Sequence, residues 1–156
     1  PYKTTQVTGA AWVVLKPNVS TGNSVTASLV NQGVVSSSQS LLYPSIAVAA
    51  NGMGFMNFAV AGDLTYPSPG YVTFSGAQGV TGPIHLARRG TAPLDDFTCY
   101  TGLGFGPACR YGDYSMGQAF GSPRRTRIYM ATEYVGPVAR DSNTNWDTYV
   151  YSAPRP

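Results

Sequence analysis

The chain has 156 residues and a formal net charge of +3, with 11% charged and 43% hydrophobic residues. This length suits one ordinary domain, residues 1–156, with enough apolar side chains for a core. Lys3 and Lys16 are its only lysines and Glu133 its only glutamate, which disfavours long exposed helices with i,i+4 ion pairs. The basic residues form no long run, so we expect no nucleic-acid partner. No apolar run reaches the roughly 18 residues of a membrane helix, so we expect no membrane span.

Two strands are predicted near the N-terminus. Residues 10–15 form an apolar, β-branched run, and Lys16-Pro17-Asn18 is expected to end this mostly buried strand in a turn. Residues 25–30 alternate apolar and hydroxyl side chains, as expected of a strand with one buried face and one wet face. A polar loop over 36–40 should follow.

A hairpin is the strongest local prediction. The apolar runs 43–50 and 53–60 are separated by Asn51-Gly52, and this dipeptide favours a type I′ turn because both residues tolerate positive φ. The cluster Tyr66-Pro67-Ser68-Pro69-Gly70 is expected to break regular structure.

Further strands are predicted at 71–74 and 84–87, before a long loop over 89–108. The only cysteines, Cys99 and Cys109, flank its Gly-rich part. We favour a disulfide over free thiols, since two cysteines and one distant histidine make a poor zinc set. A disulfide would indicate an exported, oxidising location, secreted or at the cell surface.

The C-terminal third carries three strand-like segments with aromatics and embedded carboxylates, 110–115, 128–134 and 145–150. About eight or nine strands without helical periodicity predict an all-β chain of antiparallel sheets joined by short turns. A sandwich, a barrel and a propeller all fit this spacing. A loose internal echo, with Tyr-Pro-Ser at 43–45 and again at 66–68, is typical of propeller blades.

The three C-terminal segments, Arg-Tyr-Gly-Asp-Tyr-Ser, Ile-Tyr-Met-Ala-Thr-Glu-Tyr and Asn-Trp-Asp-Thr-Tyr-Val, resemble a signature of bacterial exported, sialidase-like β-propeller proteins. Those proteins usually read Arg-Trp-Gly-Asp-Tyr-Ser, an aromatic with Glu-Tyr, and Trp-Gly-Thr. Residues 43–48 with Asn51-Gly52 are similar to an upstream strand pair of that group. Tyr111 stands where tryptophan is usual and Asp147 where glycine is usual, and the sialidase Asp-box is absent.

The resemblance implies a partial propeller of about two to three blades, because a whole propeller takes at least four blades of four strands. We therefore expect the C-terminal part of a larger propeller, one part of an assembly, or a fold that closes differently. The start at Pro1 without methionine fits a removed leader or a piece of a longer chain.

Candidate catalytic residues are Asp113, Tyr114 and Glu133. Paired carboxylates can act as acid and base or nucleophile in glycosidases, and the resemblance to sialidases implies a tyrosine activated by a glutamate. Arginines would grip a substrate carboxylate, and aromatic side chains would offer a surface for sugar stacking. The ligand-binding candidates are Arg110, Arg124, Arg127, Tyr134 and Trp146.

The structural interpretation of these groups is favoured. In it Asp113 accepts backbone N–H bonds in a turn and Glu133 pairs with Arg110 between strands. His85, the sole histidine, lies in the apolar alternation of 84–86 and is expected in the core or on a strand surface. Asp95-Asp96 lacks the spaced ligands of a recognisable calcium loop, so no cofactor or metal is expected, with calcium the one candidate ion.

The leading hypothesis is an exported, non-catalytic, propeller-like module that binds a ligand or serves a structural role, with glycans or other subunits as partners. One alternative is a sialidase-like glycoside hydrolase fragment acting on acidic glycans. Another is a self-assembling extracellular fibre or sheath subunit, which follows from the low charge and from exposed strand edges.

Overall fold

The structure of the protein is a computed structural model that describes residues 6–22, 24–104, 109–122, 126–137 and 144–154. Its regular structure in these ranges is strand, apart from two short 3₁₀ turns, Phe97–Cys99 and Thr101–Leu103. Every strand pair is antiparallel. The prediction of an all-β chain is confirmed. The described part contains no helix that is long and apolar enough to cross a membrane.

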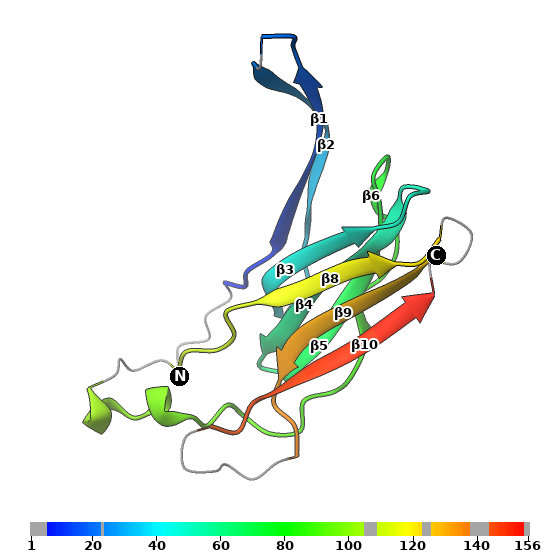
Figure 1. Cartoon of the computed structure of the whole chain (residues 1–156). Helices are drawn as coiled ribbons and strands as arrows, with labels where there is room; N and C mark the ends of the chain where they lie inside the picture. Colours follow the sequence, from blue (N-terminus) through cyan, green and yellow to red (C-terminus); the bar gives the residue numbers. More distant parts are fainter. Residues whose placement is uncertain (1–5, 23, 105–108, 123–125, 138–143, 155–156) are drawn as a thin grey trace.

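Ten strands form three sheets (Figure 1). The first sheet is a two-stranded hairpin, the second has the order β3-β4-β5-β6 with β7 paired to β5, and the third has the order β10-β9-β8. The strands are β1 (Ala10–Val19), β2 (Val25–Val35), β3 (Ser40–Val48), β4 (Met53–Gly62), β5 (Thr65–Ser75), β6 (Gly79–Val80), β7 (His85–Leu86), β8 (Ser115–Phe120), β9 (Arg127–Tyr134) and β10 (Asp147–Pro154).

The sheet built on β3, β4 and β5 is the middle layer of the molecule. One core cluster lies on its face toward the root of the β1–β2 hairpin, with Trp12 packed edge-on against Phe74. A second cluster lies toward the β8–β9–β10 sheet and includes Phe55, Ile128 and Met130. Because both faces of the middle layer are covered, the side chains of β4 from 54 to 60 are all buried.

Asn57 ties the two larger sheets together. It lies on β4, is fully buried, and its amide nitrogen is within hydrogen-bond distance of Met116 O, Ala131 O and Thr132 Oγ1, at 3.2, 3.2 and 3.0 Å. A buried amide inside an apolar layer must be hydrogen-bonded to be tolerated. Asn57 therefore fixes how β8 and β9 sit on the middle sheet.

The predicted hairpin is confirmed, because β3 pairs with β4. Its turn differs from the expected type I′. Gly52 has φ 82°, whereas Asn51 has no positive φ, and the loop is closed by the Gly52 N–H to Ala49 O at 2.9 Å. Asn51 acts through its side chain, since its Oδ1 accepts from the Met53 N–H at 3.1 Å. Asn-Gly thus marks the turn without fixing its type.

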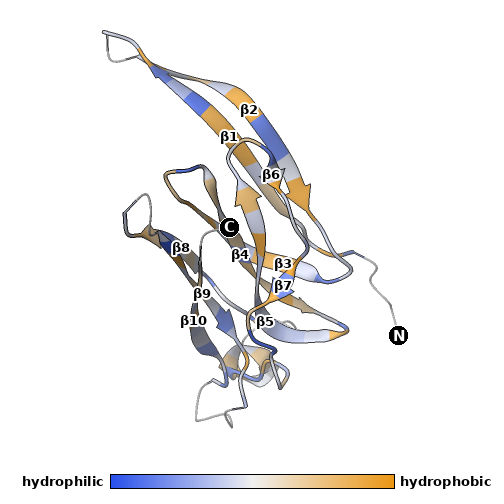
Figure 2. Cartoon of the chain, turned by 90° about the vertical axis from the view of Figure 1, so that its right-hand side faces the viewer, coloured by the Kyte–Doolittle hydropathy of each residue, from blue (hydrophilic) through white to orange (hydrophobic). Residues whose placement is uncertain are grey.

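The N-terminal strands differ most from expectation. β1 continues through Lys16-Pro17-Asn18 to Val19 and pairs with β2 to form a long hairpin, called the arm below. Figures 1 and 2 show that the arm projects away from the other sheets. The predicted strands at 10–15 and 25–30 are confirmed, but their predicted burial is wrong, because burial is confined to the root of the arm. In a two-stranded ribbon each strand has one open edge, where a proline costs little.

The predicted break at 66–70 is also wrong, because β5 runs through it. Pro67 O accepts from the Val135 N–H and Pro69 O accepts from the Ala87 N–H, at 3.1 and 2.8 Å. The N–H and C=O of one strand residue point to the same side. The missing donor of Pro69 therefore points away from β4, and the ladder to β4 is kept.

Toward the C-terminus the predictions hold more closely. The predicted strand at 84–87 is reduced to the two residues of β7. His85 is exposed on the surface of this strand and stacks on Tyr71, with 5.3 Å between the ring centroids. Residues 128–134 and 145–150 fall largely in β9 and β10. Residues 110–114 form a loop before β8, so the predicted strand at 110–115 is wrong except at its last residue.

Candidate functional site

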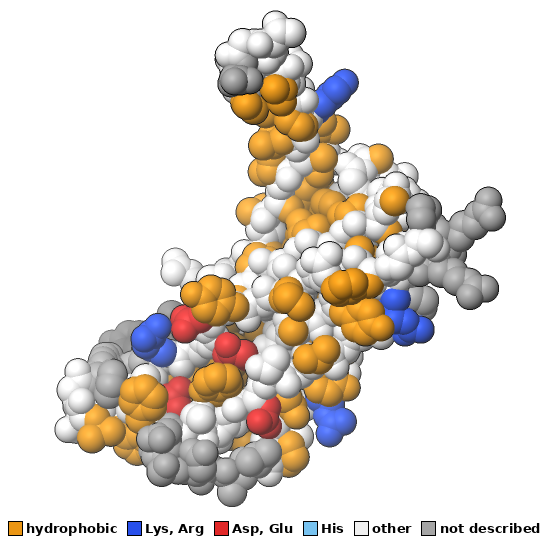
Figure 3. Space-filling model, in the orientation of Figure 1, with side chains coloured by type: hydrophobic (Ala, Val, Ile, Leu, Met, Phe, Trp, Pro, Cys, Tyr) orange, Lys and Arg blue, Asp and Glu red, His pale blue; other side chains and the backbone are white. Residues whose placement is uncertain are grey.

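The described surface has a hollow of about 350 Å³ at the loop end of the β8–β9–β10 sheet. In Figure 3 the acidic side chains gather toward the lower left of the molecule, next to basic and apolar ones, whereas other basic side chains are spread over the surface. The residues around the hollow come from the first 3₁₀ turn and its N-cap, from the loop before β8, from the end of β9 and from the residue before β10. They are Asp96, Phe97, Thr98, Arg110, Tyr111, Gly112, Asp113, Tyr114, Glu133 and Trp146.

Glu133, at the end of β9, is one of the acidic residues that line the hollow. Burial raises the pKa of the Glu133 carboxyl most strongly, and the charge of Asp113 adds to that rise. The carboxylate also accepts hydrogen bonds from the backbone of Asp113 and Gly112, and these lower the pKa in part. The net result is a pKa above the ordinary value of 4.5. The carboxylate that accepts backbone N–H bonds here is therefore Glu133, whereas the sequence analysis had predicted this role for Asp113.

Gly112 permits this arrangement. Its φ is 60°, a left-handed conformation that side chains other than glycine rarely adopt. A Cβ at this position would lie 2.9 Å from the ring of Tyr43. Tyr43 itself has φ 52°, the one positive value among described non-glycine residues. The loop at 110–114 thus wraps closely between β3 and the end of β9.

Tyr111 anchors the same loop. Its hydroxyl donates to Glu133 O at 2.6 Å, and burial, followed by the charge of Glu133, raises its pKa above the ordinary value of 10.0. A phenol with a raised pKa is a poor nucleophile at neutral pH, because less of it ionises. Tyr111 therefore works as a structural anchor.

Arg110 and Asp113 form an exposed ion pair at 3.4 Å across the loop. Its position at the surface limits its contribution to stability, since exposed pairs are worth about 0 to 1 kcal/mol. The predicted pair between Arg110 and Glu133 is not formed; Asp113 takes the guanidinium instead. The positive charge of Arg110 is thereby partly neutralised within the hollow.

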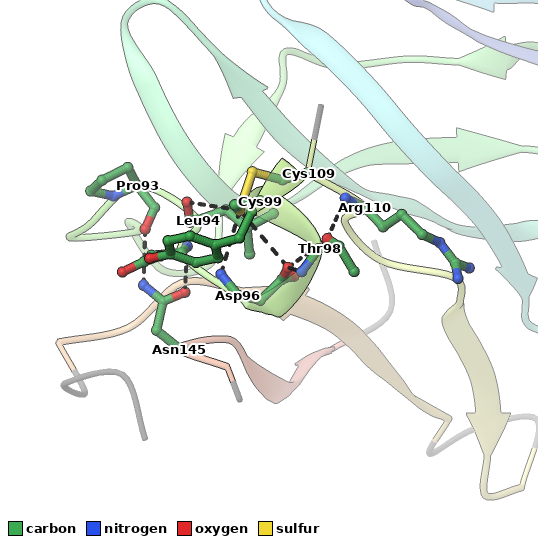
Figure 4. Close-up of a disulfide and its surroundings, with 10 residues drawn as sticks. Pro93, Leu94, Asp96, Thr98, Cys99, Cys109, Arg110 and Asn145 are labelled. Carbon is green, nitrogen blue, oxygen red and sulfur yellow. Dashed lines mark hydrogen bonds between the residues drawn. A yellow bond between two sulfur atoms is a disulfide. The ribbon is translucent and has the colours of Figure 1, made fainter. Parts of the chain in front are cut away.

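A loop closed by a disulfide forms one wall of the hollow. Figure 4 shows this disulfide and its surroundings. The predicted disulfide between Cys99 and Cys109 is confirmed. Asp96, which is buried, caps the first 3₁₀ turn by accepting from the Thr98 N–H at 2.7 Å. The Thr98 hydroxyl also bonds to Asp96 and accepts from the Arg110 N–H at 2.8 Å. The covalent bridge and this chain of bonds hold Arg110 at the edge of the hollow.

Asn145 holds the segment before β10, which carries Trp146, against the loop before the first 3₁₀ turn. Its side chain is buried, accepts from the Asp95 N–H at 2.8 Å and donates to Pro93 O at 2.9 Å. These bonds join the start of β10 to the loop before the 3₁₀ turn. The next residue, Trp146, is 41% exposed and presents its ring at the hollow.

The structure brings five of the predicted site residues to one place: Arg110, Asp113, Tyr114, Glu133 and Trp146 all line the hollow. Tyr134 does not line it and packs edge-on against Tyr149. Arg127 lies at the other end of β9, six residues or roughly 20 Å from Glu133, and bonds to Ser152 Oγ at 3.0 Å. Arg124 lies outside the described residues.

Sequence reasoning missed the residues that build the walls. Thr98, Asn145 and Gly112 were not singled out, and Asp96 was considered only as a calcium ligand. The capping pattern of Asp96 two residues before Thr98 was the available signal. The hydrogen-bond partners of Asn145 lie 50 and 52 positions earlier in the sequence, and no local pattern predicts such a contact.

No group of three or more His, Cys, Asp or Glu side chains in the described ranges could hold a metal ion. Asp95 and Asp96 both face the loop itself, since Asp95 accepts from the Tyr100 hydroxyl and Asp96 from Thr98.

The chemistry available in the hollow is therefore one guanidinium, two partly exposed carboxylates and exposed aromatic rings. Tyr114 is 83% exposed. A set of three arginines around a single ligand is not assembled by the described residues, since Arg110 is the only arginine that lines the hollow.

Comparison of the chain with models of protein families, with curated proteins and with solved structures finds no match.

Proposed function

We propose that this chain is a non-catalytic binding module that works outside the cell and takes a neutral, hydroxyl-rich ligand such as a glycan in the hollow. The observation that carries the proposal is the composition of the hollow, where Trp146 and Tyr114 offer aromatic surface beside the polar groups of Arg110, Asp113 and Glu133. Aromatic rings pack on apolar ligand faces. Carboxylates accept from ligand hydroxyls and the guanidinium donates to them.

The charges favour a neutral ligand over an acidic one. Arg110 is already paired with Asp113, and Glu133 adds a further carboxylate when ionised. An acidic sugar entering the hollow would therefore meet like charge without a free arginine to compensate it. This argues against acidic glycans, the substrates expected of a sialidase-like hydrolase.

The same geometry supports binding without turnover. Tyr111, the tyrosine in contact with Glu133, is anchored to a backbone carbonyl with a raised pKa. Glu133 is itself held by two backbone groups. Tyr111 and Glu133 are thus both committed to holding the loop.

The layered stack supports a propeller-like arrangement. Blades of a propeller are small antiparallel sheets that pack face to face, as the middle sheet and the β8–β9–β10 sheet do here. The disulfide is compatible with an extracellular location, and we propose that the module is secreted or displayed at the cell surface.

The test is binding to a glycan array, followed by calorimetry with the best neutral oligosaccharide. Trp146→Ala should weaken binding at least tenfold, and Glu133→Gln should weaken it less. The matched control is Tyr66→Ala, which removes an exposed aromatic that does not line the hollow. Equal loss in Trp146→Ala and Tyr66→Ala, or no bound neutral glycan, would contradict the proposal. Glycoside hydrolysis that disappears in Glu133→Gln or Tyr114→Phe would replace binding with catalysis.

A further inference from the structure

The projecting arm has two faces of opposite character. Residues paired across β1 and β2 share a face, and in the distal half the face that continues from Trp12 is polar, with Lys16, Asn18, Thr26 and Ser28. The opposite face, called the arm face below, is apolar at nine of its ten positions: Ala11, Val13, Leu15, Pro17, Val19, Val25, Ala27, Leu29, Gln32 and Val34. Leu15 and Leu29 are 55% and 56% exposed.

Such a ribbon is not stable alone in water. An isolated two-stranded hairpin is marginal and gains stability by packing an apolar face against another element. The arm face has no cover among the described residues, and its larger side chains are all exposed. The arm would therefore gain stability if a second element packed on this face.

A second unpartnered apolar face lies at the other end of the layered stack. The side of the β8–β9–β10 sheet that points away from the middle sheet carries Met116, Phe120, Tyr129 and Val150, all exposed. We call it the sheet face; it is turned toward the viewer in Figure 3, where apolar side chains cover much of it. Its charged residues, Arg127 and Glu133, lie at the two ends of β9, and the row Met116–Ala131–Val150 between them is apolar.

The exposed area of the chain is larger than the average for a folded monomer of this mass. The chain exposes 9795 Å² for 16.5 kDa, whereas a folded monomer of that mass exposes about 7,600 Å². The difference is roughly 2,200 Å². A standard interface removes about 800 Å² from each partner, so the excess is enough for two such interfaces on every subunit.

We propose that the arm face of one copy docks on the sheet face of a second copy, in a head-to-tail contact. One type of contact then covers both apolar faces, whereas an arm-to-arm dimer would leave the sheet face in water. It also continues the face-to-face stacking of sheets already present within the chain. The arm face carries no charged side chain, so the contact places no charge against the apolar row Met116–Ala131–Val150. Arg127 and Glu133 stay at the rim of the contact.

A head-to-tail contact gives rings when the rotation closes and filaments when it does not. The average mass by light scattering should therefore rise above that of a monomer with concentration. Leu15→Glu on the arm face and Val150→Glu on the sheet face should each reduce the protein to monomers. Leu64→Glu is the matched control, because Leu64 is 82% exposed but lies in the turn between β4 and β5, off both faces.

Mixing the two variants separates this contact from a symmetric one. Val150→Glu keeps an intact arm face and Leu15→Glu keeps an intact sheet face, so an equimolar mixture should form a heterodimer and nothing larger. Circular dichroism should show unchanged β content. If Leu15→Glu does not fold, Leu15→Thr replaces it, since threonine keeps β propensity and removes apolar surface.

A wild-type chain that stays monomeric at all concentrations overturns the proposal, as does an oligomer that survives Leu15→Glu. A mixture that stays monomeric also overturns it, whereas a Val150→Glu variant that still dimerises points to arm-to-arm contact. None of these variants lies in the hollow, so glycan binding by the monomeric variants is measured separately and can persist when self-association fails.

Discussion

Asn57 offers the sharpest test of how the two larger sheets are joined. In Asn57→Ala, two amide N–H donors are lost at about 1 kcal/mol each, and the truncated side chain leaves a small void that adds to this cost. The Asn57 Oδ1 is buried without a partner among the described residues, so its removal offsets part of the loss. We expect a net loss of about 2 to 3 kcal/mol, or roughly 4 to 12 °C in Tm for a chain of this size.

Asn57→Asp sharpens the same test. A carboxylate there would face Met116 O, Ala131 O and Thr132 Oγ1, and burial would raise the pKa of the aspartate above its unfolded value of about 3.9. The protonated acid can donate one bond, so this variant should be most stable below that value. Its free energy of unfolding should then fall as pH rises through the raised pKa.

The measurement is urea unfolding followed by circular dichroism from about pH 3 to pH 8. Asn18→Ala, an exposed asparagine on the arm, is the control and should change stability by less than about 0.5 kcal/mol. A loss below that threshold in Asn57→Ala, or a pH profile of Asn57→Asp parallel to the wild type, would refute the bridging role of Asn57.

Three further outcomes are expected. Gly112→Ala should disturb the loop and weaken ligand binding without unfolding the sheets, because it strains φ 60° and meets the Tyr43 ring; normal affinity would be inconsistent with this reading. Folding raises the pKa of Glu133, so the folded state favours its protonated form. The wild type should therefore lose stability relative to Glu133→Gln as pH rises from below 4.5 through the raised pKa. A stability difference between the two proteins that stays constant over that pH range would contradict this prediction. Replacing Cys99 and Cys109 by serine should lower stability by about 2 to 3 kcal/mol through the loop entropy of the unfolded chain, measured by denaturant titration, and a loss under about 1 kcal/mol would contradict the entropic argument.

Local patterns predicted the features that depend on a few neighbouring residues. The apolar runs beside Asn51-Gly52 indicated a hairpin because a turn and its flanking strands are set within one stretch of chain. The spacing of Cys99 and Cys109 permitted a short bridge for the same reason. The pattern did not settle the turn type, because Asn51 could meet the demands of the loop with its side chain as well as with its backbone.

The candidate site was predictable only as a set of residue types. Arg110, Asp113 and Glu133 were singled out for their charge in a chain with few charged residues, and the structure brings them to one hollow. Which carboxylate receives the backbone N–H bonds and which pairs with the guanidinium depends on how the loop at 110–114 wraps the end of β9. That choice rests on Gly112 and on Tyr43, which comes from a strand some seventy residues earlier.

The sequence by itself determined that this chain is built of strands, that a hairpin turn falls at Asn51-Gly52 and that its two cysteines can pair, because these follow from side-chain shape, backbone freedom and short-range spacing. Only the tertiary structure decided which apolar strands are covered. Val13 and Phe55 are equally apolar in the sequence, yet Phe55 is buried between two sheets and Val13 is exposed on the arm. Burial is a property of what packs against a strand, and that partner is specified by contacts far apart along the chain.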